Sequence, residues 1–301
     1  KEAIIHNLAY IEALKVVLAG LAFFGYLKTM HLNNLAAISG GFMYAFCGFM
    51  MVGSGWYLFT IEGLYFAFML LAFEQFLQYK RWWLFPISIM LIAMWQPVDV
   101  YLFALCIATY GTVRILDKNN VDLKDLVLKQ SQLAVLGILG LFMGAFLLLP
   151  TIELMLNSPR VLGDSTFFDS LRSNSIFDWV GTDLWQTTKA RLLSTNLLVN
   201  PNEVHEPIFK GAMNFLEAPA IYCSCAAILL FPQAFFFFKK QQRIMYALLL
   251  GLYIIPLFLP FVRYSFWLFA GDYYRFYSMF VIFILLFLSA HSIHFLYEKK
   301  Q

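Results

Sequence analysis

Long apolar runs recur along the chain, and each has a length that suits a membrane-spanning helix. A helix needs about 20 consecutive apolar residues to cross the hydrocarbon core of a bilayer. The runs lack the period-two alternation of a membrane β-strand, so the pattern indicates helices. We expect nine transmembrane helices, in the windows Leu8–Leu27, Leu35–Val52, Ile61–Gln78, Trp83–Val98, Tyr101–Ile115, Leu133–Leu154, Ala218–Phe238, Ile244–Phe261 and Tyr274–Leu296.

The fourth and fifth predicted spans are short and almost touch. Only the segment around Gln96-Pro97-Val98-Asp99 separates them. Proline lacks a backbone N–H and disrupts a continuing helix. We therefore expect either a tight reversal between two helices or one broken helix at this point. Broken helices form binding sites in many transporters, so the distinction bears on function.

The composition agrees with lipid as the main solvent of the chain. Hydrophobic residues make up 61% of the sequence and charged residues only 13%, and the mean hydropathy is +0.71. An ordinary soluble domain carries roughly 25% charged residues. Backbone polar groups in lipid must be satisfied within the chain itself. The predicted fold is therefore an all-α polytopic integral membrane protein. The net charge of +3 is small and gives no indication of nucleic acid binding.

Lys and Arg gather in alternate connections, and this predicts the orientation of the chain. Cytoplasmic loops carry an excess of these residues. Arg263 is the only Lys or Arg residue in the opposite set of short connections. We expect the amino end of this chain outside a bacterial membrane and the carboxyl end in the cytoplasm. The expected cytoplasmic connections and end contain Lys28, Lys80, Arg81, Arg114, Lys118, Lys124, Lys129, Lys239, Lys240, Arg243, Lys299 and Lys300.

Three parts follow from these spans. Residues 1–156 form a first group of about six helices, residues 157–217 an extracytoplasmic segment, and residues 218–301 a second group of about three helices. The middle segment has no Asn-x-Ser/Thr acceptor site, which favours a bacterial protein. The segment Asn119–Lys129 is predicted to be a short amphipathic helix on the cytoplasmic surface. Because no signal pattern precedes the first span, we expect the chain to be an internal piece of a longer protein.

Glu12, Lys15 and Glu74 fall inside predicted spans, where an ionisable residue costs roughly 2.5–3.5 kcal/mol on insertion scales. Glu12 and Lys15 lie three residues apart on one helical face, so they can neutralise each other. Alternatively, Lys15 belongs to an anion site. Glu74 lies about one turn from the expected cytoplasmic end of its span, where it either pairs with another helix or extends to the interface.

A second group of charged residues gathers at the expected outer boundary. Guanidinium and ammonium groups at such an interface can hold the phosphate of a lipid. The alternative is ordinary anchoring at the interface. The group consists of Asp99, Glu153, Arg160, Arg263, Asp272 and Arg275.

No residue pattern indicates a metal or a cofactor. His291 and His294 lie one turn apart and could ligate a metal, but capping or headgroup contact is the favoured role. A disulfide framework is not expected, because all four cysteines lie in apolar stretches. No phosphate-binding glycine loop, zinc motif or nucleophile elbow occurs in a suitable context. The cysteines are Cys47, Cys106, Cys223 and Cys225.

Several segments, in this order and spacing, resemble the bacterial YfhO-type membrane proteins of the GT-C glycosyltransferase superfamily. They extend over nearly the whole chain. The matching stretches are Leu14-Lys15 with Leu18–Leu27, Gly41–Phe49, Leu148-Leu149-Pro150 with Ser158-Pro159-Arg160, and Tyr273-Tyr274-Arg275-Phe276-Tyr277.

The resemblance implies a GT-C-like enzyme that transfers a sugar from a polyprenyl-phosphate carrier to an extracytoplasmic acceptor. The acceptor would be lipoteichoic acid or another surface glycopolymer or glycolipid. On this reading Arg275 is the first candidate for donor-phosphate binding, followed by Lys15, Arg160 and Arg263, because cations stabilise a departing phosphate. The carboxylates Asp272, Glu153 and Asp99 would support them.

The chain departs from the family pattern in one respect that concerns catalysis. Family members begin in the cytoplasm and carry their expected catalytic acid on a large first outer loop, whereas this chain is expected to begin outside. The resemblance therefore implies that the general base lies upstream of Lys1. Two other functions stay open: a transporter or flippase of lipid-linked sugars, and a non-catalytic membrane scaffold subunit.

Overall fold

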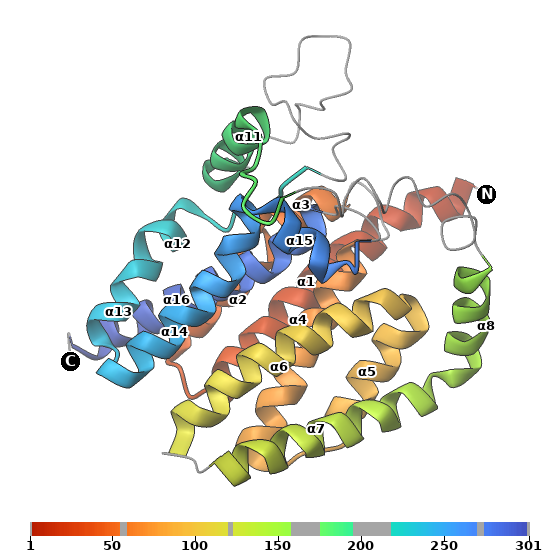
Figure 1. The fold of residues 1–301 in the computed structure, drawn as a ribbon, viewed down its shortest axis with the longest axis horizontal. Helices are drawn as coiled ribbons and strands as arrows, with labels where there is room; N and C mark the ends of the chain where they lie inside the picture. The colour runs from red at the N-terminus through yellow and green to blue at the C-terminus, as the bar shows by residue number, and fades with distance from the viewer. Residues whose placement is uncertain are drawn as a thin grey trace.

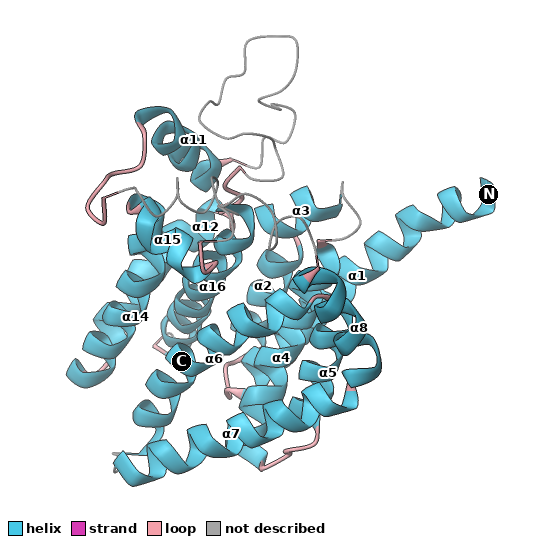
Figure 2. Cartoon of the chain, turned by 45° about the vertical axis from the view of Figure 1, so that its right-hand side comes forward, coloured by secondary structure: helices cyan, strands magenta, loops and turns pink. Residues whose placement is uncertain are grey.

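The described part of the chain is built from helices alone. The computed structural model describes residues 2–54, 59–119, 123–157, 175–194, 218–269 and 274–299, and no strand occurs in these ranges (Figures 1 and 2). The predicted all-α fold is thereby confirmed. The helices are α1 (Glu2–Thr29), α2 (Asn34–Ala45), α3 (Gly48–Ser54), α4 (Thr60–Tyr79), α5 (Leu84–Trp95), α6 (Pro97–Asn119), α7 (Leu123–Met143), α8 (Ala145–Leu156), α11 (Thr182–Leu193), α12 (Cys225–Leu230), η1 (Phe231–Gln233), α13 (Ala234–Phe237), α14 (Lys240–Phe258), α15 (Pro260–Phe266) and α16 (Tyr274–Glu298).

Seven helices in the described ranges are long and apolar enough to cross a membrane. They are α1, the combined α2 and α3, α4, α6, α7, α14 and α16. The expected fourth span is the 12-residue helix α5. The expected seventh span is divided into α12, η1 and α13. The chain is therefore a multi-pass helical membrane protein, but the predicted number of nine full-length spans is not confirmed.

The predicted boundaries are wrong for the sixth span. Sequence analysis expects a surface helix over residues 119–129 followed by a span from Leu133 to Leu154, whereas α7 is continuous from Leu123 to Met143 and α8 is a separate helix. Figure 1 shows α8 turning away from α7 at their junction. The charged residues in the first turns of α7 lower the average hydropathy there, so the sequence window begins too late. The helix can nevertheless include them, because long cationic side chains can extend to the interface.

The segment at Pro97 is a tight reversal. Helix α5 ends at Trp95 and α6 begins at Pro97. Proline suits a first helical position, where the missing N–H would have no partner within the helix. Of the two predicted possibilities, the structure therefore has the reversal and not the broken helix.

Small residues bring α1 and α2 into backbone contact. A Cβ atom on Gly41 would lie 2.8 Å from the carbonyl oxygen of Gly20, and one on Gly20 would lie 2.9 Å from the Cβ of Ala45. Such small-residue contacts are common between membrane helices, because lipid gives no hydrophobic drive for helix association. Residues after Thr29 therefore fold back closely along α1.

Helix α16 lies at the centre of the bundle. Almost every residue from Tyr274 to Ala290 is buried, and the helix packs against α2 and α14. Its Phe280 and Phe283 make edge contacts with Phe66 of α4, at ring-centroid distances of 5.8 and 5.7 Å. The first and the last parts of the chain therefore share one core.

Candidate functional site

Three helices place a charged residue in the first turn at the same end of the bundle. Glu62 lies in the first turn of α4, Asp99 in that of α6 and Arg275 in that of α16. The positive end of the helix dipole favours both carboxylates and disfavours the guanidinium. Arg275 therefore needs another source of stabilisation. We call these three residues the carboxylate cluster.

The carboxylate cluster is buried and its members interact. The residues are 4%, 2% and 4% exposed, respectively. Arg275 Nη2 lies 3.8 Å from Glu62 Oε2, and Asp99 interacts electrostatically with both. The Arg275 guanidinium also lies over the Phe59 ring, 3.3 Å from its centroid, and 5.1 Å from that of Phe49. Carboxylates and aromatic faces together offset the cost of burying this cation.

Charge is not balanced within the carboxylate cluster. Two carboxyl groups face one guanidinium, and no donor in the described part of the chain makes a hydrogen bond to Glu62 Oε2. A buried polar atom without a hydrogen bond is rare and costly. It is found where a ligand, water or a catalytic role compensates.

The predicted ion pair between Glu12 and Lys15 forms next to this cluster. Lys15 Nζ lies 2.6 Å from Glu12 Oε1. The hydroxyl of Thr60 donates a hydrogen bond to the other oxygen of Glu12. Because Thr60 and Glu62 both belong to the first turn of α4, this turn carries the contacts to both charged groups.

Arg263 is buried and contacts the end of α14. Its Nη1 donates a hydrogen bond of 2.8 Å to the carbonyl oxygen of Pro256, and its guanidinium stacks over Tyr274 at 4.2 Å. The last carbonyl groups of a helix have no partner within it. The backbone N–H of Val180 caps Phe258 O in the same way, at 2.9 Å. The geometry of Arg263 thus supports a capping contact and the packing of α16.

The other predicted site residues are divided between exposed and undescribed positions. Glu153 is exposed on α8. Arg160 and Asp272 lie outside the described residues. The residue that the prediction omits is Glu62. It could have been found, because it lies inside the predicted span Ile61–Gln78, where an acidic residue is costly.

A second charged group joins four helices at the opposite end of the bundle. Arg114 of α6 binds the fully buried Glu74 of α4 with two nitrogens, at 2.7 and 3.1 Å. Tyr110 donates to Glu74 Oε1 at 2.9 Å, and Asp117 accepts from Arg114 and from Tyr246 of α14. Tyr26 of α1 completes the group through Tyr110. Helix pairing is therefore the role of Glu74 among the predicted alternatives, and Arg114 is a buried partner instead of a free loop charge.

The two histidines of α16 form hydrogen bonds with backbone groups. His294 Nδ1 accepts a hydrogen bond from the backbone N–H of Asn33, and His291 Nδ1 bonds the carbonyl oxygen of Phe287 at 2.9 Å. Within the described ranges, no three His, Cys, Asp or Glu residues come close enough to hold a metal ion.

Comparison with known proteins gives one match. Residues 2–182, more than half of the 301-residue chain, match the family model of the bacterial membrane protein YfhO. No curated protein and no solved structure matches the chain. The match covers α1 to α8 and therefore both carboxylates of the cluster. The chain belongs to the YfhO family of bacterial membrane proteins.

Proposed function

We propose that this chain is part of a membrane glycosyltransferase of the GT-C type. It would move a sugar from a polyprenyl-phosphate donor to an extracytoplasmic acceptor such as lipoteichoic acid. One observation carries the proposal: two buried carboxyl groups share a single guanidinium at one end of a membrane bundle, in a chain of the YfhO family.

Charge decides the roles that we assign within the cluster. Because the carboxyl groups outnumber the cation, the cluster attracts a proton more readily than a second anion. Glu62, whose Oε2 accepts no hydrogen bond from the described residues, is the proposed general base for the acceptor hydroxyl. Arg275 holds Glu62 in place, and Asp99 interacts with the same guanidinium. This assignment is an alternative to two sequence-based expectations that stay predictions: that Arg275 binds the donor phosphate, and that the general base lies upstream of Lys1.

Because Arg275 is assigned to Glu62, we assign the binding of the donor phosphate to other cations. Lys15 is the nearest candidate by topology, since its partner Glu12 contacts the same turn of α4. Arg160 is the second candidate from the sequence. A cation near the bridging oxygen would stabilise the charge that develops as polyprenyl phosphate leaves. Glu62 takes the proton of the acceptor hydroxyl, and the new glycosidic bond replaces the bond from the sugar to phosphate.

The test compares two Glu→Gln variants of the full-length protein. Glu62→Gln should lower the rate of sugar transfer at least about a hundredfold, in line with the loss of a general base. The control is Glu298→Gln, which makes the same chemical change at the far end of α16, where Glu298 pairs only with His294 among the described residues. Transfer by the control should equal that of the natural sequence.

Folding must be separated from chemistry in this comparison. Elution from a sizing column in detergent should be the same for both variants. Near-normal transfer by well-folded Glu62→Gln would exclude Glu62 as the base. Movement of the lipid-linked sugar across the bilayer without a glycosidic product would instead indicate a flippase.

A further inference from the structure

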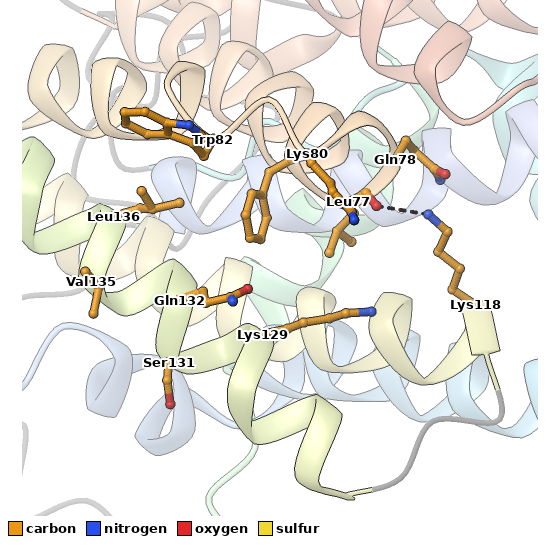
Figure 3. A pocket seen from close by; sticks show the side chains of 11 residues that line it. Leu77, Gln78, Lys80, Trp82, Lys118, Lys129, Ser131, Gln132, Val135 and Leu136 are labelled. Atoms are coloured by element: carbon orange, nitrogen blue, oxygen red, sulfur yellow. Dashed lines mark hydrogen bonds between the residues drawn. The ribbon is translucent and has the colours of Figure 1, made fainter.

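A cavity with three lysines lies at the end of the bundle opposite the carboxylate cluster. It has a volume of about 860 Å³ and opens between the end of α4 and the first half of α7. Figure 3 shows the side chains of Lys80, Lys118 and Lys129 directed toward this space from three different segments. We call it the lysine pocket.

The lining of the lysine pocket is cationic, and none of the described residues that line it is acidic. The remaining polar residues are Gln78, Ser131 and Gln132, all neutral donors or acceptors. In the described part of the chain, no carboxylate forms an ion pair with Lys80 or Lys129. Lys118 and Lys129 repel each other electrostatically, so an anion in the pocket would relieve this repulsion.

Two of the three lysines have a local structural explanation. Lys80 caps the carboxyl end of α4, where a cation interacts favourably with the helix dipole. Lys118 donates a hydrogen bond of 3.0 Å to the carbonyl oxygen of Leu77, near the end of α4 (Figure 3). Glu74 attracts the Lys118 ammonium group electrostatically, whereas Lys129 and Arg114 repel it. Lys129 lies in the second turn of α7, so the favourable interaction of a cation with a helix carboxyl end does not account for its position.

The walls of the lysine pocket indicate what kind of anion it takes. Val135 and Leu136 of α7 line it together with Trp82. Val135 and Trp82 are exposed, and the exposed apolar surface of α7 continues along the helix through Leu139. A soluble phosphate has no apolar part that could cover this surface. The acyl chains of a lipid would cover it, and tryptophan is enriched at the level of lipid headgroups.

We propose that the lysine pocket binds the phosphate of an anionic phospholipid, with the acyl chains lying along α7. Basic pockets between membrane helices are suited to such headgroups. Gln132 would donate an amide hydrogen to a remaining headgroup oxygen, whereas the side-chain amide of Gln78 donates to Glu74. The proposal is independent of the glycosyltransferase function, because the carboxylate cluster lies at the other end of the bundle.

The test measures lipid binding to the delipidated, full-length protein by native mass spectrometry. Phosphatidylglycerol is the anionic probe, and phosphatidylcholine is the zwitterionic reference. The double variant Lys80→Gln/Lys129→Gln leaves the Lys118 hydrogen bond in place. It should bind phosphatidylglycerol about thirtyfold more weakly, since each basic residue near an anionic headgroup contributes about fivefold. Phosphatidylcholine binding should not change.

A second double variant tests whether the pocket itself is responsible. Lys124→Gln/Lys240→Gln removes two exposed lysines at the same end of the bundle, neither of which lines the pocket. This variant should bind phosphatidylglycerol as tightly as the natural sequence does. Equal weakening in both double variants would overturn the proposal, because it would show diffuse attraction by surface charge. Displacement of the lipid by millimolar inorganic phosphate would also overturn it and indicate a soluble anion.

Discussion

At the scale of single residues, Glu74 shows how the chain tolerates a charge inside the membrane. Two nitrogens of Arg114 and the hydroxyl of Tyr110 satisfy its carboxylate. Removal of one partner from a buried ion pair leaves the other charge without compensation. The pair therefore connects α4 to α6 strongly, although its formation from two isolated charges is not a large net gain.

This arrangement predicts that Glu74→Ala destabilises the fold by about 3 kcal/mol, because Arg114 remains buried. Glu298→Ala is the matched control. Because Glu298 is the exposed member of its pair with His294, the expected loss is less than about 1 kcal/mol. Unfolding in increasing concentrations of sodium dodecyl sulfate, followed by circular dichroism, measures both. Equal stability of the two variants would contradict a structural role for Glu74.

Ion pairs within one helix can be predicted from the sequence, but ion pairs between helices cannot. Glu12 and Lys15 are close in sequence, and their ion pair is predictable from helical spacing. Glu74 and Arg114 are forty positions apart, and no local pattern connects them. Sequence therefore marks Glu74 as unusual but cannot identify its partner. Glu62 and Arg275 pose the same problem over a longer separation.

At the scale of helices, the contact between α1 and α2 depends on missing side chains. Gly41→Leu should separate the two helices, because a Cβ atom there already meets Gly20 O and Phe24 Cβ within 3 Å. Gly137→Leu on α7 is the control, since its Cβ would meet no atom within 4 Å. We expect the first variant to aggregate or unfold at a lower temperature and the second to behave as the natural sequence. Scattering during a thermal ramp measures the difference, and indistinguishable curves would contradict the close packing.

Hydropathy predicts helices better than it predicts their ends. The windows identify α1, α4, α6, α14 and α16. For α7 they find the helix but place its start at Leu133 instead of Leu123, because its first two turns mix Lys124, Asp125 and Lys129 with apolar residues. A window average treats these charges as a break, whereas a helix can turn them toward the interface while its apolar residues continue along the helix. The division of the seventh predicted span into short helices likewise has no signal in average hydropathy.

At the scale of the whole molecule, the family and the helical membrane fold agree with prediction, and the orientation stays a prediction.

Impermeant maleimide added to intact cells should label Ser175→Cys but label Lys239→Cys only after permeabilisation. A Cys225→Ser background is required, because Cys225 is the exposed member of the four native cysteines. Labelling of Lys239→Cys in intact cells would reverse the expected orientation and place the carboxylate cluster on the cytoplasmic side.

The most direct test of the proposed function is product formation by the full-length protein. Purified protein in lipid vesicles is mixed with a radiolabelled sugar on polyprenyl phosphate and with a lipoteichoic acid acceptor. We predict a labelled glycosidic product that requires both substrates and that Glu62→Gln fails to form. Intact donor after prolonged incubation with active, well-folded protein and a range of acceptors would contradict the glycosyltransferase assignment.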